Sequence, residues 1–518
     1  MARSTKPASS VRPAVTRIEK DTMGEMTVPA HALYGASTQR AVLNFPISGR
    51  PVPFEIIAAY AAIKSSCASV NERLKRLDPA RTRLIRRACD EIAAGLTDRG
   101  GWATHFPIDV FQTGSGTSTN MNANEVIANL ICLYRDKPIG SSKDAAYLKA
   151  GGVHPNDHVN MGQSSNDTFP TSIHVAAAAE ICRDLIPALA KMRAQLDKQA
   201  RAWDRLVKIG RTHLQDATPI RLGQEFSGFA SQLAHAENRA RLALAALEEL
   251  PIGGTAVGTG INAHPQFGKL VSAQLTAHYK PLIAKTVSPS LRRFAPANLH
   301  PKFREADNHF EAQHAKDGVV EASSHLKTIA VSLSKIASDI RLMGMGPRCG
   351  LGELRIPAVQ PGSSIMPGKV NPVIVEAMMM VVCQVIGNDS AITFAGAGGV
   401  GGLLDLHVAM PVMAERLLES IRLLARGAEV FTDNLLAGLE PDAERCKELI
   451  EGSLAMCTSL VPVIGYDRSA ALAKEAYKQG KTVRQLALEQ KIVSEKDLNK
   501  YLDPWSMTLP GGEGSAGG

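Results

Sequence analysis

Apolar residues recur every three or four positions through long stretches of this chain. The clearest stretch has them at steps of three and four residues: Leu326, Ile329, Leu333, Ile336, Ile340 and Met343. This spacing places the apolar side chains on one face of a helix, as in helices that pack into a bundle. Between Glu311 and Leu342 there is one glycine and no proline, so we expect a single helix of about 45 Å there.

Four further stretches have the same helical character. They cover residues 171–203, with a kink expected at Pro187, and residues 224–250, 373–389 and 412–437. Helices well beyond the usual mean of about 12 residues are expected to pack side by side and bury their apolar stripes against each other. The pattern therefore predicts a mainly α fold: a bundle of long helices, flanked by smaller helical pieces, with few strands.

Composition narrows the class of protein. Of the 518 residues, 45% are hydrophobic and 21% charged, which is ordinary globular usage and excludes disorder as the main theme. No stretch of about 18 uncharged apolar residues occurs, so we expect no membrane span. The net charge of +8 is mild for this length. Without zinc-finger spacing, RNA-binding aromatic motifs or a block of five like charges, no nucleic-acid partner is expected.

The eight cysteines are scattered, and the closest pair, Cys446 and Cys457, is eleven residues apart. This excludes a CxxC motif and a dense disulfide framework, and it favours reduced thiols in an intracellular protein. The basic, Ser- and Pro-containing residues 1–16 lack the apolar core of a secretory signal, so we expect them to be disordered. We expect a cytoplasmic protein rather than one of the mitochondrial matrix.

Four segments break the bundle pattern with small polar residues. The first, Thr113–Asn122 (TGSGTSTNMN), offers many free backbone N–H groups just before a helix, an arrangement suited to anions. Gly/Ser loops are common, so this signal is weak by itself. The second runs from His154-Pro155-Asn156-Asp157 to Asp167. Part of it must cap the following helix, but capping uses only one or two residues and leaves the others unexplained.

The third segment, Gly210–Pro219, contains His213 among Thr212, Gln215 and Asp216. Such neighbours could fix the histidine tautomer for general acid–base catalysis, although a lone histidine is more often structural. The fourth, 362–372 (GSSIMPGKVNP), is a hydroxyl-rich loop with one lysine. It has neither the GxxxxGK[ST] spacing of a nucleotide-binding loop nor the GxSxG motif of an esterase.

No dinucleotide fingerprint follows a strand pattern, and no HExxH arrangement is present. These absences favour acid–base chemistry on a small anionic substrate, with no cofactor and no metal.

The sequence GSSIMPGKVNP strongly resembles the signature of the fumarase/aspartase superfamily. Other segments are similar to the same family in the same order: TGSGTSTNMNANEVIAN, HPNDHVNMGQSSNDTFPT, GRTHLQDATP and GGTAVGTGIN. The resemblance runs from about Arg17 to near Leu502. Three positions, His213, Gly368 and Ser165, are similar to the class II fumarase branch, because aspartase-like members usually carry Gln, Ala and Thr there.

The resemblance implies three domains: a mixed, mostly helical N-terminal domain (1–161), a central five-helix bundle (162–440) and a small C-terminal helical domain (441–518) with a flexible tail. It also implies a homotetramer in which four bundles form a twenty-helix core. Each active site would draw its segments from three subunits.

The implied activity is the reversible, stereospecific hydration of fumarate to L-malate in the tricarboxylic acid cycle, a carbon–oxygen lyase reaction on a small dicarboxylate. Family roles would make Ser363 the base at carbon, with His213 and Glu376 handling the proton of water. Without the resemblance, Ser363 reads as an ordinary loop hydroxyl. The substrate carboxylates would be held by a larger set: Ser115, Gly116, Thr117, Ser164, Ser165, Asn166, Thr212, Ser364, Lys369, Val370 and Asn371.

Two departures from the family pattern stand out. A secondary dicarboxylate site is implied at His154, Pro155, Asn156 and Asp157, but Gly151 and Gly152 replace the basic residues often found before it, so we expect poor anion binding. The segment Gly401–Val408 also departs, with Asp405 and His407 where relatives often carry Glu and Asn. Two alternatives stay open: an ammonia-lyase acting on aspartate or another lyase of the superfamily, and a non-enzymatic helical scaffold with a decayed site. The site residues are intact, which argues against decay: Ser363, His213, Lys369, Asn371 and Glu376.

Overall fold

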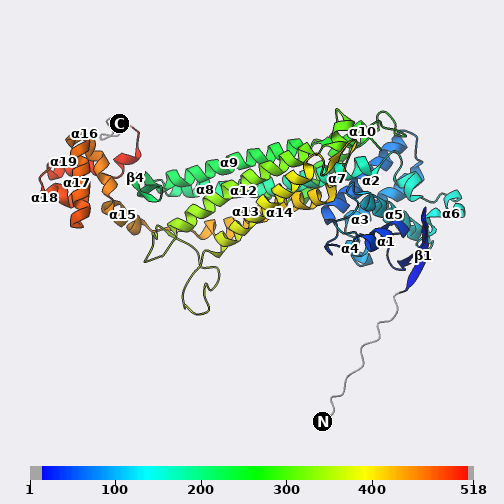
Figure 1. The fold of residues 1–518 in the computed structure, drawn as a ribbon, viewed down its shortest axis with the longest axis horizontal. Helices are drawn as coiled ribbons and strands as arrows, with labels where there is room; N and C mark the ends of the chain where they lie inside the picture. Colours follow the sequence, from blue (N-terminus) through cyan, green and yellow to red (C-terminus); the bar gives the residue numbers. More distant parts are fainter. Residues whose placement is uncertain (1–14, 511–518) are drawn as a thin grey trace, which may run out of the picture.

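The structure, a computed structural model, describes residues 15–510. Figure 1 shows an elongated molecule with small helices at both ends and long helices between them. The mainly α fold is confirmed, because the strands among the described residues form only two-stranded sheets. The predicted disorder of residues 1–16 falls mostly on residues outside the described part of the chain, and Thr16 already pairs with Pro29. The predicted flexible tail likewise lies largely outside it.

The N-terminal end begins with an antiparallel hairpin of β1 (Thr16–Asp21) and β2 (Gly24–Pro29). Helices follow: α1 (Ala36–Asn44), α2 (Phe54–Arg73), α3 (Pro79–Ala93), α4 (Trp102–His105), α5 (Thr117–Tyr134) and α6 (Ala145–Lys149). Of these, α2 and α5 carry buried apolar faces, against which α3 and α1 pack.

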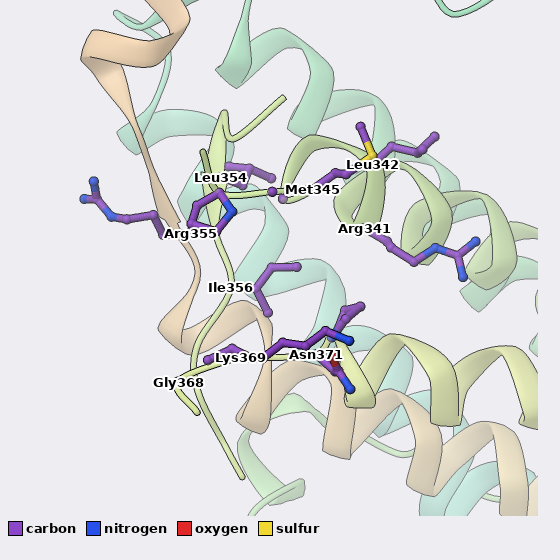
Figure 2. A pocket seen from close by; sticks show the side chains of 14 residues that line it. Arg341, Leu342, Met345, Leu354, Arg355, Ile356, Gly368, Lys369 and Asn371 are labelled. Carbon is purple, nitrogen blue, oxygen red and sulfur yellow. The ribbon is translucent and has the colours of Figure 1, made fainter. Parts of the chain in front are cut away.

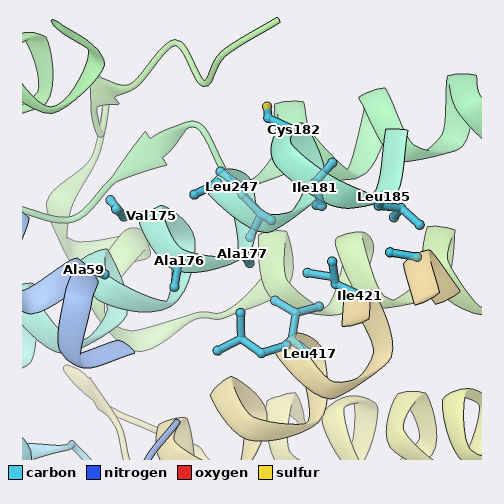
Figure 3. Packing of buried hydrophobic residues seen from close by; sticks show 14 of the residues in the cluster. Ala59, Val175, Ala176, Ala177, Ile181, Cys182, Leu185, Leu247, Leu417 and Ile421 are labelled. Carbon is cyan, nitrogen blue, oxygen red and sulfur yellow. The ribbon is translucent and has the colours of Figure 1, made fainter. Parts of the chain in front are cut away.

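Five long helical segments form the bundle: α7 (Ser165–Glu180) continuing into α8 (Ile186–Ala202), then α9 (Leu222–Ala246), α12 (Asp317–Met343), α13 (Val373–Gly396) and α14 (Met410–Asn434). The predicted stripe from Leu326 to Met343 is buried along α12. Figure 3 shows Ile181, Leu185, Leu417 and Ile421 facing one another inside this core.

A π-helical turn, η4 (Ile181–Leu185), separates α7 from α8 just before Pro187. Proline has no N–H to donate and its ring crowds the preceding turn, and a π-bulge is one way in which a helix accommodates such a disturbance. The helical run is thus interrupted next to Pro187, while the kink expected there stays a prediction.

The prediction of one helix from Glu311 to Leu342 is wrong at its start. A short α11 (His309–His314) ends before α12 begins. The buried Lys316 ammonium donates to the carbonyls of Ala312, Gln313 and Ala315. These bonds satisfy the carbonyls at the end of α11, so the chain turns there instead of continuing as a helix.

Connections at the two ends of the bundle carry the remaining elements. Helix α10 (Phe267–Thr286) packs back on α2, and β3 (Val207–Thr212) pairs with β4 (Gln215–Arg221) beyond the end of α8. Short strands are β5 (Glu249–Leu250), β6 (Arg304–Glu305), β7 (Leu354–Arg355), β8 (Gly402–Leu403), β9 (Leu406–His407) and β10 (Glu440–Pro441).

The C-terminal helices have a hydrophobic core of their own. They are α15 (Ala443–Gly452), α16 (Val461–Ile464), α17 (Tyr466–Gln479), α18 (Val483–Glu489) and α19 (Glu495–Tyr501). Their buried residues run from Ile450 to Leu502, whereas one continuous cluster from Val28 to Leu439 spans the N-terminal end and the bundle. The domain boundaries at 161/162 and 440/441 stay predictions.

Among the described residues, α13 alone is long and apolar enough to span a membrane, judged by length and composition only. Helix α13 packs between α12 and α14 in the bundle. Its buried Asp389 accepts a hydrogen bond from Ser323 of α12, and its buried Asn388 donates to Ser420 of α14. These polar contacts are those of a helix in a protein core. Only about one third of the most apolar stretch of α13 is buried within one chain, so an apolar face of this helix is left uncovered.

Candidate active site

Two helix N-termini carry the first group of predicted residues. Helix α5 begins at Thr117, after Gly116 as its N-cap, and α7 begins at Ser165. The hydroxyl oxygens of Thr117 and Ser165 lie 2.8 Å apart, and Ser115 Oγ lies 2.9 Å from Thr117 Oγ1. Backbone N–H groups at a helix N-terminus carry partial positive charge. Together the two ends form a cluster of neutral donors suited to a carboxylate.

Close backbone packing explains the glycines of this segment. Gly116 has φ +73°, and a Cβ there would lie 2.0 Å from the Phe169 ring. A Cβ on Gly114 would lie 1.6 Å from the carbonyl oxygen of Val408, and Met410 N–H donates to Gly114 O. The TGSGTS segment is thus held between α7 and the chain entering α14.

The second segment is partly a cap, as its composition predicts. Ser164 is the N-cap of α7 and accepts the N–H of Asn166, and the carboxylate of Asp167 completes the capping box by accepting the N–H of Ser164. Asn166 donates to the carbonyl of Ala256. The cap uses the side chains of Ser164 and Asp167, so those of Ser165 and Asn166 are not needed for capping.

His213 lies at the tip of the β3–β4 hairpin. His213 and Leu214 have φ of +57° and +61°, the conformation of a two-residue type I′ turn. The side chain is exposed. Within the described chain no hydrogen bond joins it to Thr212, Gln215 or Asp216, so the idea that these neighbours fix its tautomer is wrong for a single chain. Asp216 instead lies 3.8 Å from Arg211.

A buried carboxylate anchors this hairpin. Glu353 is fully buried and accepts from the Arg211 guanidinium at 2.9 Å, while the buried Lys208 ammonium lies 3.4 Å away. Glu353 also leads into β7, ten residues before Ser363. The hairpin and the GSS loop are consequently fixed at the same end of the bundle.

The GSS loop closes on itself. Gly362 N–H donates to the carbonyl of Lys369, and the Asn371 amide donates to Gly362 O at 2.6 Å. The Ser363 hydroxyl oxygen accepts from the N–H groups of Ile365 and Met366 at 3.2 and 3.0 Å. Such N–H groups stabilise negative charge on an oxygen.

Other predicted residues of the loop are open to solvent. Ser364, Lys369, Val370 and the nearby Glu376, in the first turn of α13, are all exposed. Lys369 and Asn371 also line a cavity of about 660 Å³ with Arg341, Arg355 and Ile356. Figure 2 shows Lys369 and Asn371 beside each other, below Ile356.

The predicted residues thus form two groups that one chain does not bring together. The hydroxyl cluster lies where α7 begins, and the hairpin and GSS loop lie where α8 and α12 end. Helix α12 has 27 residues, so the two groups are separated by about 40 Å. Within the described residues, no hydrogen bond or ion pair joins His213 to Glu376.

The implied secondary site has a structural role. His154 caps the π-helical turn η3 (Pro155–Val159), its Nδ1 accepting from the N–H groups of Asn156 and Asp157. Burial lowers the pKa of His154. A Cβ on Gly152 would lie 2.3 Å from the Tyr147 ring. A basic residue cannot occupy that position without moving the ring, which gives the physical reason for the missing positive charge.

The departure at His407 also has a structural explanation. His407 is fully buried, and its Nδ1 accepts from the Ala409 N–H at 3.3 Å. Burial, and secondarily the positive charge of Lys316, lowers its pKa to about 4. Gly401 makes room for the ring, because a Cβ there would lie 2.3 Å from it.

Two buried charged residues near the hydroxyl cluster, Asp167 and Lys64, were not predicted. Asp167 accepts from the N–H groups of Ser164, Gly253 and Thr255, and Lys64 donates to two asparagine side chains. Asp167 belongs to the HPNDHVNMGQSSNDTFPT segment. Lys64 is a single lysine in an apolar helix, and no sequence motif indicates a role for it. No group of three or more His, Cys, Asp or Glu suited to a metal ion occurs within residues 15–510.

Comparison with known proteins defines the class first. A family model described as Lyase matches residues 24–387, and one described as Fumarase C C-terminus matches residues 456–509. The class is that of the lyases.

More specific relatives are the class II fumarate hydratases. That of Corynebacterium glutamicum is 49% identical over 500 residues, covering 95% of this chain and 96% of the relative. That of Mycobacterium tuberculosis is 48% identical, with the same coverage. The crystal structure of class II fumarase from Schistosoma mansoni matches with a TM-score of 0.88 and 35% identity, covering 96% of this chain and all of that one. The chain belongs to the class II fumarate hydratase family.

Proposed function

We propose that this protein is a fumarate hydratase that interconverts fumarate and L-malate. The observation that carries the proposal is the pair of helix N-termini joined through Thr117 and Ser165, in a chain of this family. Their hydroxyls and N–H groups suit a carboxylate. Aspartate ammonia-lyase is the second candidate, and His213 disfavours it because aspartase-like members usually carry Gln at that position.

The reaction requires two proton transfers on opposite faces of the substrate. In the direction from malate, a weakly acidic C–H beside a carboxylate loses its proton, and the charge spreads into that carboxylate. Catalysis therefore requires a base at carbon, an acid near the departing hydroxyl and fixed donors around the carboxylate.

We assign the base at carbon to Ser363. A serine is a weak base at neutral pH, so its alkoxide must be stabilised. The two N–H groups that point at its oxygen supply that stabilisation, and Lys369 in the same loop adds positive charge. The kinetics of Ser363→Ala test this role.

We assign the transfer at the departing hydroxyl to His213, with Glu376 as its partner from another copy of the chain. Exposed at a hairpin tip, His213 is free to enter a neighbouring subunit's site. Its backbone conformation is sparsely populated for a non-glycine residue, as is common at functional sites.

We further propose a homotetramer in which each site is shared. The two groups of residues lie at opposite ends of one bundle, so a complete site needs more than one copy. An uncovered apolar face supports this: on α13, Met380 and Phe394 are 67% and 69% exposed. Exposed apolar surface of this kind is typical of an interface between subunits. We propose the cytoplasm as the location.

The decisive experiment measures the absorbance of fumarate after purified protein is mixed with L-malate, with no cofactor added. Appearance of fumarate supports the proposal, and activity should be unchanged in EDTA. A parallel reaction with L-aspartate tests the second candidate. Fumarate from aspartate but not from malate would overturn the assignment, and fumarate from neither would favour a non-enzymatic scaffold.

A further inference from the structure

The hydroxyl cluster at the two helix N-termini contains no charged side chain. Its predicted members are Ser115, Gly116, Thr117, Ser164, Ser165 and Asn166. A dicarboxylate dianion in water is strongly solvated, and neutral donors alone replace that solvation poorly. Lys369, the cation of the GSS loop, lies at the opposite end of the same bundle and, in the proposed tetramer, reaches the cluster only from another copy of the chain.

A buried ammonium lies directly beneath this cluster. Lys64, in the middle of α2, is completely buried. Its Nζ donates at 2.8 Å to the side-chain oxygens of Asn120, in the first turn of α5, and Asn160, which precedes α7. One cation thus contacts both segments that lead into the hydroxyl cluster.

The asparagines pass this contact on to the cluster. Asn160 donates to the carbonyl of Gln163, next to Ser164. The hydroxyl of Thr168 donates to the carbonyl of Ser164 and lies 3.4 Å from the Asn120 side-chain oxygen. A displacement of Lys64 would therefore move both helix N-termini.

The charge of Lys64 is only partly compensated. The titratable groups around it are Asp167 of α7, Tyr60 and Cys67 of α2, and Cys89 of α3. Burial raises the pKa of both thiols, so they stay neutral. The Asp167 carboxylate makes its hydrogen bonds to three backbone N–H groups instead of to Lys64. Desolvation raises the pKa of Asp167 to about 7 and lowers that of Lys64 to about 8.

We propose that Lys64 is a positioning residue that also adds positive charge near the carboxylate site. It holds Asn120 and Asn160, and through them the N-termini of α5 and α7. The electric field of its ammonium group favours a dianionic ligand, although Lys64 itself does not contact that ligand. This inference rests on the proposed function of the same site.

The test compares Lys64→Gln and Lys64→Arg with the unaltered tetramer. Two competitive inhibitors serve as probes: succinate, with two negative charges, and succinamate, with one. Lys64→Gln should weaken succinate on the order of tenfold, as expected for one buried charge nearby, and succinamate clearly less. KM for malate should rise more than kcat falls. Lys64→Arg should keep the preference for succinate.

A second variant keeps the test decisive if Lys64→Gln does not fold. Asn160→Asp places a carboxylate on Lys64 Nζ and cancels its charge, so the preference for succinate should fall in the same way. Lys191→Met is the control: this buried lysine pairs with Asp433 on α14, away from both helix N-termini, and the preference should be unchanged.

If Lys64 were purely structural, Lys64→Gln would weaken the binding of both inhibitors equally. That result, or an unchanged KM for malate in Lys64→Gln, overturns the proposal. Absence of malate activity in the unaltered protein would instead count against the proposed function. The two failures are therefore distinguishable.

Discussion

The hydroxyl oxygens of Thr117 and Ser165 lie 2.8 Å apart, although 48 residues separate them in the sequence. This contact joins the first turns of α5 and α7, whose N–H groups have no partner inside their own helices. A carboxylate placed there would meet donors from both helices at once.

Thr117→Val removes one hydroxyl of this pair while keeping its shape. Hydrogen bonds to charged groups contribute about 1.5–3 kcal/mol, so binding of malate and succinate should weaken on the order of tenfold to a hundredfold. Inhibition constants and KM measure the effect. Ser118→Ala, in the same turn of α5, is the matched control and should bind normally; equal binding by Thr117→Val and the unaltered protein would contradict the assignment.

Ser363→Ala should lower kcat far more than it weakens binding, because the base acts mainly in the transition state. General base catalysis is typically worth about 10² to 10⁴ in rate. Lys369→Ala is the useful contrast, since losing a fixed charge should damage KM and kcat together. If Ser363→Ala turns over malate at a near-normal rate, the serine is only a loop residue.

His213→Asn should also cost about 10² to 10⁴ in kcat while leaving the tetramer and succinate binding intact. Asparagine tolerates positive φ well, so the hairpin tip should keep its shape. Steady-state kinetics and light scattering check both points. A normal rate would remove His213 from the reaction.

Mixing two impaired variants, assayed at a malate concentration below KM, tests whether sites are shared. Tetramers of the double variant Thr117→Val/Ser165→Ala carry their defect in the hydroxyl cluster, at one end of the bundle. Tetramers of Ser363→Ala carry it in the GSS loop, at the other end. After dissociation and reassembly, random hybrids should regain about a quarter of the sites. Activity that stays at the level of the unmixed variants would mean that one chain builds its own site.

His407 should make the protein sensitive to acid. Its pKa is lowered to about 4 in the folded chain from an ordinary value of 6.5. As the pH falls between these values, the unfolded chain binds a proton that the folded chain does not, so stability falls. His407→Asn should reduce this loss in the free energy of unfolding between pH 7 and pH 4.5 by on the order of 2 kcal/mol. Unfolding in urea at pH 7 and pH 4.5 measures it. An equal loss of stability between the two pH values in His407→Asn and the unaltered protein would contradict the prediction.

The sequence predicts the parts of the structure that depend on local pattern. The stripe from Leu326 to Met343 and the cap at Ser164 follow from spacing and residue type, and both are present. The end of α11 was missed because Lys316 reaches back to carbonyls that only the fold presents to it. Lys64 was missed for a related reason: its partners lie 56 and 96 residues away, and no periodicity reports such a contact.

The long bundle also limits how this protein can change during evolution. One residue inserted in the middle of α12 would turn everything after it by about 100° and move it 1.5 Å along the axis. The buried stripe would then lose its register, and the hairpin and GSS loop would lose their distance from the hydroxyl cluster of a neighbouring copy. Compensation would require matched changes in the helices packed around it. Length differences between related chains should therefore accumulate in the connections and at the termini, while the helices of the bundle keep a constant number of residues.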